Sequence, residues 1–378
     1  MLNNCVAVLN ISSSALTLIV GERSVNGTFA FRAKESVEYY AFYNGEFSDV
    51  KEFKLKLEEL YANLIENNAI SSINEIYVSL PGEFAKTVSK NYKITFNKAK
   101  KITLGDVETL YNLAFEELEN YTLVNRSEIY YLINNVKTHN VIGATSASLA
   151  GRLCYVYAQN YFKNLIDEVL SGIGVKTIKY VSLDVALNQY LFSGDSKDVC
   201  RILLNVGNVT TSVSIASGNG LLFSGAVAQG GGIISAYLSN NLECDYYVAD
   251  TLKNKINLGL RDNAEASYLI TDRFNEEFLA SRNEVNDITK NVLDELAEDV
   301  DKLLGSCTLK IPSDVEIYFT GSGICSIRGA VEYVASRLNS YPNVIAPSIP
   351  HYNKPSKSDI IALLDTVLVY KNDKIFFA

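Results

Sequence analysis

The chain has no tryptophan and very few of the residues from which common catalytic centres are built. Its 378 residues include one methionine and two histidines, His139 and His351. Two histidines leave little from which to assemble a multi-histidine metal site or a Ser-His-Asp hydrolase. Its six cysteines include no CxxC pair and no other metal-ligand spacing, which favours small buried thiols in a reducing cytosol.

Long apolar runs are missing as well, and no cluster of positive charge stands out. No apolar run approaches the roughly 20 residues of a membrane helix. The N-terminal apolar run is broken by Asn10 and Ser12–Ser14, so no signal peptide is expected. The chain carries 34 basic and 43 acidic side chains, a net charge of −9. Because no Lys/Arg cluster stands out, we expect a folded cytoplasmic protein that does not bind nucleic acid.

The most informative stretch lies in the middle of the chain. It has three short apolar and β-branched runs, Ile202–Val206, Thr210–Ala216 and Leu221–Ala228, separated by turns. The run Gln229–Gly232 then allows the backbone to approach another group closely, before a helix expected from about Ile233. The pattern predicts strand, tight polar turn, strand, hairpin turn, strand and helix.

The same pattern occurs near the N-terminus, in Val6–Ile11, Ala15–Val20 and Thr28–Ala33. Leu9–Ile11 aligns with Leu204–Val206 at a constant offset of 195 residues. Two copies placed half a chain apart predict two similar half-domains. The length agrees with this, because 378 residues are too many for one hydrophobic core.

Between residues 83 and 157 the sequence becomes β-rich with one helix, which indicates an inserted subdomain. Thr103 and Asp106 form a capping-box pattern before the helix Val107–Leu118. Asp184 is expected to be the N-cap of a further helix. The other elements expected from periodicity are the helices Val50–Asn67, Asn160–Gly172, Asp184–Phe192, Tyr246–Leu258 and Gly329–Leu338, one or two helices within Arg273–Leu304, the strands Ile73–Leu80, Ala85–Phe96, Glu128–Val136, Ala144–Leu149, Cys154–Ala158, Val175–Val181 and Val315–Phe319, turns at Asn26-Gly27 and Asn44-Gly45, and a C-terminal helix from Ser358 followed by a hairpin at Val367–Phe377.

Several loops together resemble those of the actin/Hsp70/sugar-kinase ATPase superfamily, and more closely those of the bacterial cell-division FtsA family. Asn10–Ser14 resembles the first phosphate loop of that family, Asn205–Ser212 the second, and Thr320–Gly323 the adenosine loop. Tyr77–Gly82 and Ile102–Val107 resemble the entry into the subdomain that distinguishes FtsA and the pilus-assembly relative PilM from actin.

This resemblance implies an α/β fold that is actin-like (RNase H-like), a duplicated two-domain fold with an inserted small α+β (SHS2-like) subdomain. Ala249–Lys253 resembles the family's helix beside the nucleotide. The implied division is residues 1–82 for the first half of domain 1, 83–157 for the insert, 158–200 for the return to domain 1, 201–345 for domain 2, and 346–378 for a C-terminal return to domain 1.

The resemblance also implies ATP as a ligand, held by glycines and hydroxyls of these loops, because backbone amides of Gly-rich turns and hydroxyl groups can cradle phosphates. The implied cofactor-binding residues are Ser12, Ser13, Ser14, Gly207, Asn208, Thr210, Thr211, Gly231, Gly232, Lys253, Gly321, Ser322 and Gly323. Each feature has a structural alternative as well. The glycines then serve only as a tight turn, the serines as a polar turn, and Lys253 as a solvated helix lysine.

The chain departs from the family where the family carries charge. Asn10 and Asn205 stand at aspartate positions, Ser212 stands at a later aspartate position, and Val181 stands at the position of the water-orienting glutamate. Mg²⁺ prefers carboxylate oxygens, and phosphoryl transfer needs an oriented water. We therefore expect no bound metal, no catalytic residue and little or no hydrolysis, and nucleotide binding itself stays open.

The resemblance implies a scaffold of bacterial cell division at the septum. Such a scaffold self-associates into filaments or dimers, or binds an FtsZ-like division filament or other division proteins. Lys371–Ala378 has no basic-apolar helical stripe, so contact with the inner face of the cell membrane is expected only through a partner. The acidic helix around Glu295–Asp301 is either a solvated face or a partner surface. A PilM-like pilus or secretion adaptor and an active ATPase or kinase of the same superfamily are the alternatives.

Overall fold

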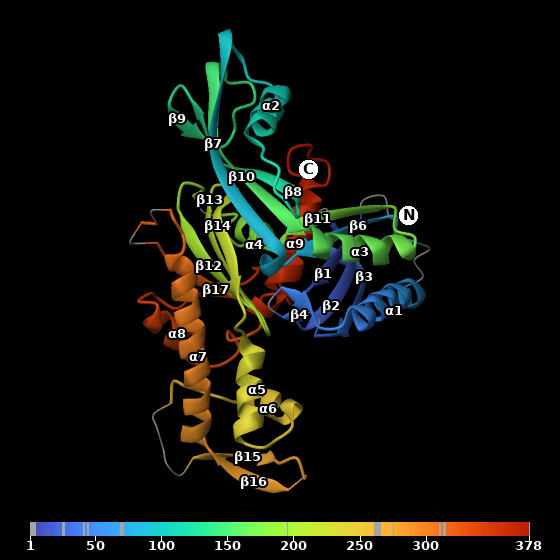
Figure 1. The fold of residues 1–378 in the computed structure, drawn as a ribbon, viewed down its shortest axis with the longest axis vertical. Coiled ribbons are helices and arrows are strands. Elements are labelled where there is room, and N and C mark those ends of the chain that lie inside the picture. Colours follow the sequence, from blue (N-terminus) through green and yellow to red (C-terminus); the bar gives the residue numbers. More distant parts are fainter. Residues whose placement is uncertain are drawn as a thin grey trace. The chain divides into compact units, whose positions relative to one another are not determined.

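The computed structural model describes residues 5–24, 27–40, 42–43, 45–68, 72–194, 196–260, 266–274, 276–309, 311–312 and 315–377. The chain forms two compact units, which are described separately (Figure 1). Unit 1 comprises Met1–Arg201, Ser214–Gly225 and Asp359–Ala378, and unit 2 comprises Ile202–Val213 and Ala226–Ser358. Asn26 and Asn44, on which two turns were predicted, lie outside the described residues.

Unit 1 is organised around a five-stranded sheet of order β11-β6-β1-β2-β3. Its strands are β1 (Val6–Ile11), β2 (Ala15–Arg23), β3 (Phe29–Glu38), β6 (Glu75–Leu80) and β11 (Thr177–Ser182). β1 is antiparallel to β2 and parallel to β6, and β6 is parallel to β11. Every residue of β1 is buried, which agrees with its unbroken apolar pattern at the centre of a sheet.

Four helices pack around this sheet: α1 (Val50–Asn68), α3 (Asn160–Gly172), α4 (Leu183–Leu191) and α9 (Ser358–Tyr370). α1 packs against β2 and β3 with an apolar face of four buried residues at helical spacing, Phe53, Leu57, Leu60 and Leu64. α9 approaches β2 closely, because a β-carbon on Gly21 would lie 3.2 Å from the side chain of Leu364. A small hairpin of β4 (Phe42–Tyr43) and β5 (Glu46–Phe47) precedes α1.

The insert is a second sheet of unit 1, with strand order β7-β10-β8-β9. It consists of β7 (Ala85–Lys101), α2 (Leu104–Ala114), β8 (Tyr121–Ile133), β9 (Val136–Thr138) and β10 (Thr145–Gln159), and a short 3₁₀ turn at Gly82–Phe84 precedes it. An apolar core lies between α2 and the sheet. The capping box of Thr103 and Asp106 is confirmed, and it starts the helix at Leu104, earlier than predicted.

Four sequence predictions in unit 1 are wrong. The single strand expected at Glu128–Val136 is interrupted, because β8 ends at Ile133 and turns at residues 134–135 into the antiparallel β9. Two short strands were expected from residue 144 to 158, but β10 is continuous, since its alternating residues are buried against α2 along one face. The N-cap of α4 is Ser182, whose hydroxyl accepts from the Val185 amide, and Asp184 lies in the first turn. The hairpin Val367–Phe377 does not form, because α9 continues to Tyr370.

The C-terminal segment instead joins the insert to the rest of unit 1. Phe377 forms a β-bridge with Asn125, and the Arg126 amide donates to the carbonyl oxygen of Phe376 over 2.9 Å. The Phe376 ring stacks on Tyr370 with a centroid distance of 4.3 Å. The buried side chain of Asn125 donates to the Tyr180 carbonyl and accepts from the Ser182 amide, so β8 and β11 are also fastened together.

Unit 2 contains most of a second five-stranded sheet, of order β14-β13-β12-β17-β18. Its strands are β12 (Arg201–Val206), β13 (Thr211–Ser217), β14 (Gly220–Val227), β17 (Ile317–Thr320) and β18 (Asn343–Val344). Its helices are α5 (Gly231–Asn241), α6 (Tyr246–Lys253), α7 (Arg282–Gly305) and α8 (Ala330–Arg337). A hairpin of β15 (Ser267–Thr271) and β16 (Glu277–Ser281) was not predicted, and it occupies the start of the region expected to be helical.

The two large sheets confirm the predicted duplication. The strand order is the same in both sheets: β11-β6-β1-β2-β3 in the first corresponds to β18-β17-β12-β13-β14 in the second. In each copy the first strand is parallel to the fourth, and the fourth is parallel to the fifth. The five-part residue division stays a prediction.

Of the described cysteines, Cys154 and Cys244 are buried and the other four are half-buried, and all six are free thiols. No described helix is both long enough and apolar enough to cross a bilayer.

Candidate functional site: the glycine loops of unit 2

The glycine loops of unit 2 meet because two parallel strands end at the same edge of the sheet. β12 pairs with β17 so that Asn205 lies opposite Thr320. The loop after β12 therefore lies beside the loop Thr320–Gly323, and the Gly323 amide donates to the Val206 carbonyl over 2.8 Å. This carboxyl edge is where nucleotides and phosphates bind in open α/β sheets.

Glycine is required at this junction because the backbones nearly touch. A β-carbon on Gly321 would lie 2.3 Å from the Val206 carbonyl oxygen, and one on Gly323 would lie 2.2 Å from that of Gly207. Gly321 also has a φ of +96°, in the region that favours glycine. The T-G-x-G sequence of this loop therefore has a packing reason, whether or not a ligand is present.

The start of α5 closes on the same loop. The amides of Gly231 and Gly232 donate to the carbonyl oxygens of Gly207 and Asn208, over 3.0 and 2.6 Å. A β-carbon on Gly231 would lie 2.1 Å from the carbonyl oxygen of Gly323. The N-terminal amides of a helix are a common anion-binding site, but here two of them already have backbone acceptors. A phosphate would have to displace these carbonyls.

Other predicted residues also have partners within unit 2. The Thr211 hydroxyl donates to the Gln229 carbonyl over 2.6 Å, and the Gly207 amide donates to the Thr210 carbonyl over 2.9 Å. Thr210 is half-buried and Ser322 is exposed, so their hydroxyl groups are the more accessible ones at the junction. The structure thus brings Gly207, Asn208, Thr210, Thr211, Gly231, Gly232, Gly321, Ser322 and Gly323 into one group of interlocked loops.

Lys253 is buried, so the alternative prediction of a solvated helix lysine is wrong. Its ammonium lies 2.6 Å from Oδ1 of Asp250, and the same oxygen accepts from the Ser235 hydroxyl over 2.8 Å. Burial raises the pKa of Asp250, but the hydrogen bonds from Lys253 and Ser235 outweigh it, and the net shift is downward. The lysine is therefore held against α5. Sequence analysis missed Asp250, although its i,i+3 spacing to Lys253 was a usable signal.

The predicted serine loop lies in unit 1, between β1 and β2. The Ser12 hydroxyl accepts from the Ala15 amide and donates to the Ala15 carbonyl, so it closes its own turn. Ser13 is buried, and the Ser14 carbonyl accepts from the Tyr39 amide. Asn10 is buried beside this turn, and its Oδ1 has no hydrogen-bond partner among the described residues.

Among the described residues, charged groups suited to a metal ion do not gather at these loops. The aspartate positions of the resemblance are buried amides, Asn10 and Asn205, both 8% exposed. Within the part of the chain that the structure describes, no group of three or more His, Cys, Asp or Glu side chains has the geometry to hold a metal. What the junction offers chemically is hydroxyls, amide side chains and tightly packed backbone.

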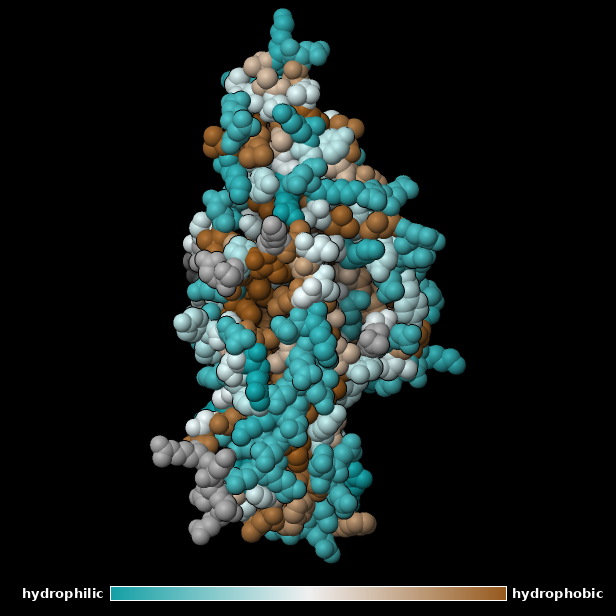
Figure 2. All heavy atoms as spheres, turned by 60° about the vertical axis from the view of Figure 1, so that its left-hand side comes forward, coloured by the Kyte–Doolittle hydropathy of each residue, from teal (hydrophilic) through white to brown (hydrophobic). Residues whose placement is uncertain are grey.

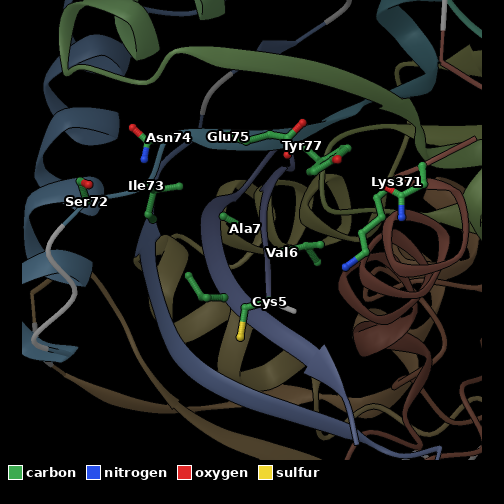
Figure 3. A pocket seen from close by; sticks show the side chains of 11 residues that line it. Cys5, Val6, Ala7, Ser72, Ile73, Asn74, Glu75, Tyr77 and Lys371 are labelled. Carbon is green, nitrogen blue, oxygen red and sulfur yellow. The ribbon is translucent and has the colours of Figure 1, made fainter. Parts of the chain in front are cut away.

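A cavity of about 540 Å³ lies at the other end of the unit 1 sheet (Figure 3). It opens at the N-terminal ends of β1 and β6, where Cys5 and Glu75 stand, and Lys371 reaches it from the segment after α9. Glu75 is paired with Lys179 over 3.0 Å. Because the predicted loops lie at the carboxyl ends of the strands, this cavity is not part of the predicted nucleotide site.

The duplicated sheets, with a serine loop after β1 in one copy and glycine loops at the carboxyl edge of the other, are the arrangement of an actin-like fold. No protein-family model matches the sequence. The chain is 21% identical over 316 residues to the cell division protein FtsA of Helicobacter pylori, which covers 79% of this chain and 64% of that relative. The chain is thus similar to FtsA at low identity, and it spans less than two thirds of the length of that relative.

Solved structures place the fold in the same group. The PilM–PilN type IV pilus biogenesis complex matches with a TM-score of 0.62 and 14% identity, over 96% of this chain and 98% of the other. MreB5 of Spiroplasma citri bound to AMPPNP matches at 0.54 and 11%, over 98% of both chains. The MamK double helical filament matches at 0.54 and 14%, over 95% and 99%. The chain therefore has the actin-like fold of the FtsA/PilM type.

Proposed function

We propose that this chain is an assembly scaffold that uses the actin-like fold without a cycle of ATP hydrolysis. The observation that carries the proposal is the interlocking of the glycine loops. Amides of Gly231, Gly232 and Gly323 donate to the carbonyls of residues 206–208, where an anion would otherwise need them. Retained glycines with occupied amides are expected when the loops are kept for packing.

The charge pattern supports the same proposal. Phosphoryl transfer requires Mg²⁺ held by carboxylates and a residue that orients water. Neutral amides at positions 10 and 205 cannot replace the charge of aspartate, and Val181, which is fully buried, cannot polarise water. In this arrangement the residues do not fit a magnesium-bound triphosphate, so no reaction step is assigned to them.

Self-association is the proposed mode of action. Its support is fold-level, since the relatives include a cell division protein and a double helical filament. In this proposal the partner is another copy of the chain, or a filament of the FtsZ type at the septum.

A pilus or secretion adaptor is the second candidate, favoured by the match to the PilM–PilN complex over nearly the whole of both chains. An active ATPase is the third, favoured by the nucleotide-bound MreB5 structures.

Sedimentation velocity and negative-stain electron microscopy of the purified chain test this proposal, each with and without Mg·ATP. We expect concentration-dependent assemblies whose size does not change with nucleotide. Co-pelleting with FtsZ-type filaments separates the division scaffold from the adaptor, because an adaptor remains in the supernatant. Assembly that starts only when Mg·ATP is added, or a chain that stays monomeric and fails to co-pellet, would contradict the proposal.

A further inference from the structure

The longest strand of the insert carries an unusual concentration of positive charge. Six of the 17 residues of β7 are lysine and none is acidic: Lys86, Lys90, Lys93, Lys98, Lys100 and Lys101. This feature does not stand out in the sequence, because only Lys100 and Lys101 are adjacent and the other four lysines are spread along the strand. From Ala85 to Tyr157 there are nine basic and six acidic side chains, whereas the remainder of the chain has 25 basic and 37 acidic ones.

Most of these lysines are exposed, and four of the six form no ion pair with a described residue. Lys90 pairs with Glu116, and Lys100 pairs with Asp106 over 2.6 Å. The other four, Lys86, Lys93, Lys98 and Lys101, are exposed and make no ion pair with any described residue. β7 is an edge strand in the described sheet, and its C-terminal end is the outermost part of the insert (Figure 1).

Exposed apolar side chains lie next to the lysines at this end. Leu104 begins α2 with 41% of its surface exposed, and Ile142 is 58% exposed. The two are neighbours, because Ile102 and the segment 143–144 exchange backbone hydrogen bonds of 2.8 Å. In Figure 2, hydrophilic and hydrophobic atoms are intermixed on the surface of the insert.

Val136, the first residue of β9, extends this apolar group with 66% of its surface exposed. The turn before it lies beside the end of β7, because Asn134 and Ser146 are hydrogen-bonded and Ser146 is paired with Lys100. We call the set of Lys98, Lys100, Lys101, Leu104, Val136 and Ile142 the basic tip. It combines the two features by which peripheral proteins hold an anionic bilayer, namely cationic side chains and exposed apolar side chains beside them.

We propose that the basic tip docks on the surface of an anionic lipid bilayer. The lysines would lie among anionic headgroups while Leu104, Val136 and Ile142 reach the acyl boundary. An anionic surface attracts the net positive charge of the insert and repels the net negative charge of the rest of the chain, which favours contact through the insert. The proposal concerns direct membrane contact, whereas the sequence predicted contact only through a partner.

An acidic polypeptide added to the β7 edge would also satisfy the lysines, but it fits the structure less well. The pairing of β7 with β10 is interrupted between Ser146 and Ser148, so residues 96–99 bulge out of the ladder. Such a bulge disfavours regular strand addition, and lysines on an edge strand also discourage pairing with other strands. An acidic peptide has no need of the three exposed apolar side chains beside the lysines.

Vesicle co-sedimentation of the full chain tests the proposal, with phosphatidylcholine alone and with added phosphatidylglycerol. We expect binding to the anionic vesicles only, reversed by high salt. The double variant Lys98→Glu/Lys101→Glu should weaken this binding more than tenfold, since each basic residue at such a surface contributes about fivefold. Leu104→Gln/Ile142→Gln tests the apolar part, and it should also weaken binding while the salt dependence is retained.

The matched control is Lys51→Glu/Lys255→Glu, which makes the same charge change at two exposed lysines outside the insert. It should bind as the unchanged chain does. Circular dichroism melting confirms that each variant is folded. Absence of binding, equal binding to neutral vesicles, or binding unaffected by Lys98→Glu/Lys101→Glu would overturn the proposal. Lysine-dependent binding to soluble polyglutamate without vesicle binding would also overturn it, and would assign the tip to an acidic polypeptide.

Discussion

The Gly232 amide donates to the Asn208 carbonyl oxygen over 2.6 Å, and the Asn208 side chain fills the space that a β-carbon on Gly232 would need. This contact ties the start of α5 to the loop after β12. The loop that resembles a phosphate cradle is therefore a packing unit in its own right. An alanine at one of these glycines should lower the free energy of unfolding more when the added β-carbon lies closer to a backbone atom that cannot move.

Alanine substitutions of the glycines test that role. Gly231→Ala places a β-carbon 2.1 Å from the Gly323 carbonyl oxygen, which is backbone and cannot move aside. We expect it to lower the free energy of unfolding by about 2–3 kcal/mol. Gly232→Ala should cost less, because it meets the end of the Asn208 side chain, which can rotate.

The control for the glycine series is Gly172→Ala at the end of α3, where no atom lies within 4 Å of the added β-carbon. Chemical denaturation should give the lowest free energy of unfolding for Gly231→Ala, a higher one for Gly232→Ala and the highest for Gly172→Ala. Equal stability of Gly231→Ala and Gly172→Ala would show that the loops do not interlock in solution.

Restoring the missing carboxylates tests whether the site is ready for magnesium. Asn10 and Asn205 are each 8% exposed, so an ionised aspartate at either position would lose most of its hydration and destabilise the folded state. We expect Asn10→Asp and Asn205→Asp to lower the free energy of unfolding by about 1–3 kcal/mol each. A bound ligand would raise the melting temperature by mass action, and we expect no such rise with Mg·ATP.

Asn91→Asp, on the exposed part of β7, is the matched control and should leave the stability nearly unchanged. Differential scanning fluorimetry with and without Mg·ATP gives the comparison. A melting temperature of Asn205→Asp that rises with Mg·ATP would mean that one substitution is enough to rebuild the metal site, contrary to our account.

Glu128 makes the stability of unit 1 depend on pH. It lies on a cavity of about 180 Å³ together with His139 and Asp373, and its carboxylate accepts from the side chain of Asn219. Burial raises the pKa of Glu128 to about 7. The folded state therefore keeps a proton that the unfolded chain has already lost, and stability falls as the pH rises from about 4.5 toward 7.

Glu128→Gln removes this ionisation while it keeps an oxygen for Asn219. We expect the variant to be more stable than the unchanged chain by roughly 3 kcal/mol at about pH 8, and by little at about pH 5. Glu117→Gln, at an exposed position, is the control. Denaturant titrations at the two pH values measure the difference, and a gain that is the same at both would refute the assignment.

The C-terminal segment should contribute substantially to the stability of unit 1. Phe376 is 2% exposed and stacks on Tyr370, and its carbonyl accepts from the Arg126 amide. Phe376→Ala removes a buried ring, so we expect a loss of about 3–4 kcal/mol in the free energy of unfolding. Phe274→Ala is the control, since that ring is 84% exposed in unit 2. Similar melting temperatures for both variants would show that the segment is not docked.

Much of the fold could be predicted because the local spacing of apolar residues indicates the strands and helices. The repeat of Leu9–Ile11 at Leu204–Val206 predicted two sheets of the same order, and the structure has them. Helix α3 has the predicted ends, Asn160 and Gly172. The predictions failed where burial depends on distant residues, as in α9, whose apolar residues are buried on several sides and resemble a strand pattern.

The loops themselves could be located from glycine and serine spacing, but their contacts could not. Nothing local shows that the Gly231 amide donates to Gly207, because that contact depends on how β12, β17 and α5 come together. The pairing of the buried Lys253 with the half-buried Asp250 was hidden for the same reason, since it depends on how α6 packs against α5. The charge of β7 was visible in the sequence, but its place on an exposed edge strand was not.

Isothermal titration of Mg·ATP into the unchanged chain is the most direct test of the central claim. The amides of Gly231, Gly232 and Gly323 already have carbonyl partners, so the account predicts no heat of binding at millimolar nucleotide and no phosphate release. A micromolar dissociation constant accompanied by turnover would contradict it, and would return the chain to the active ATPases of this fold.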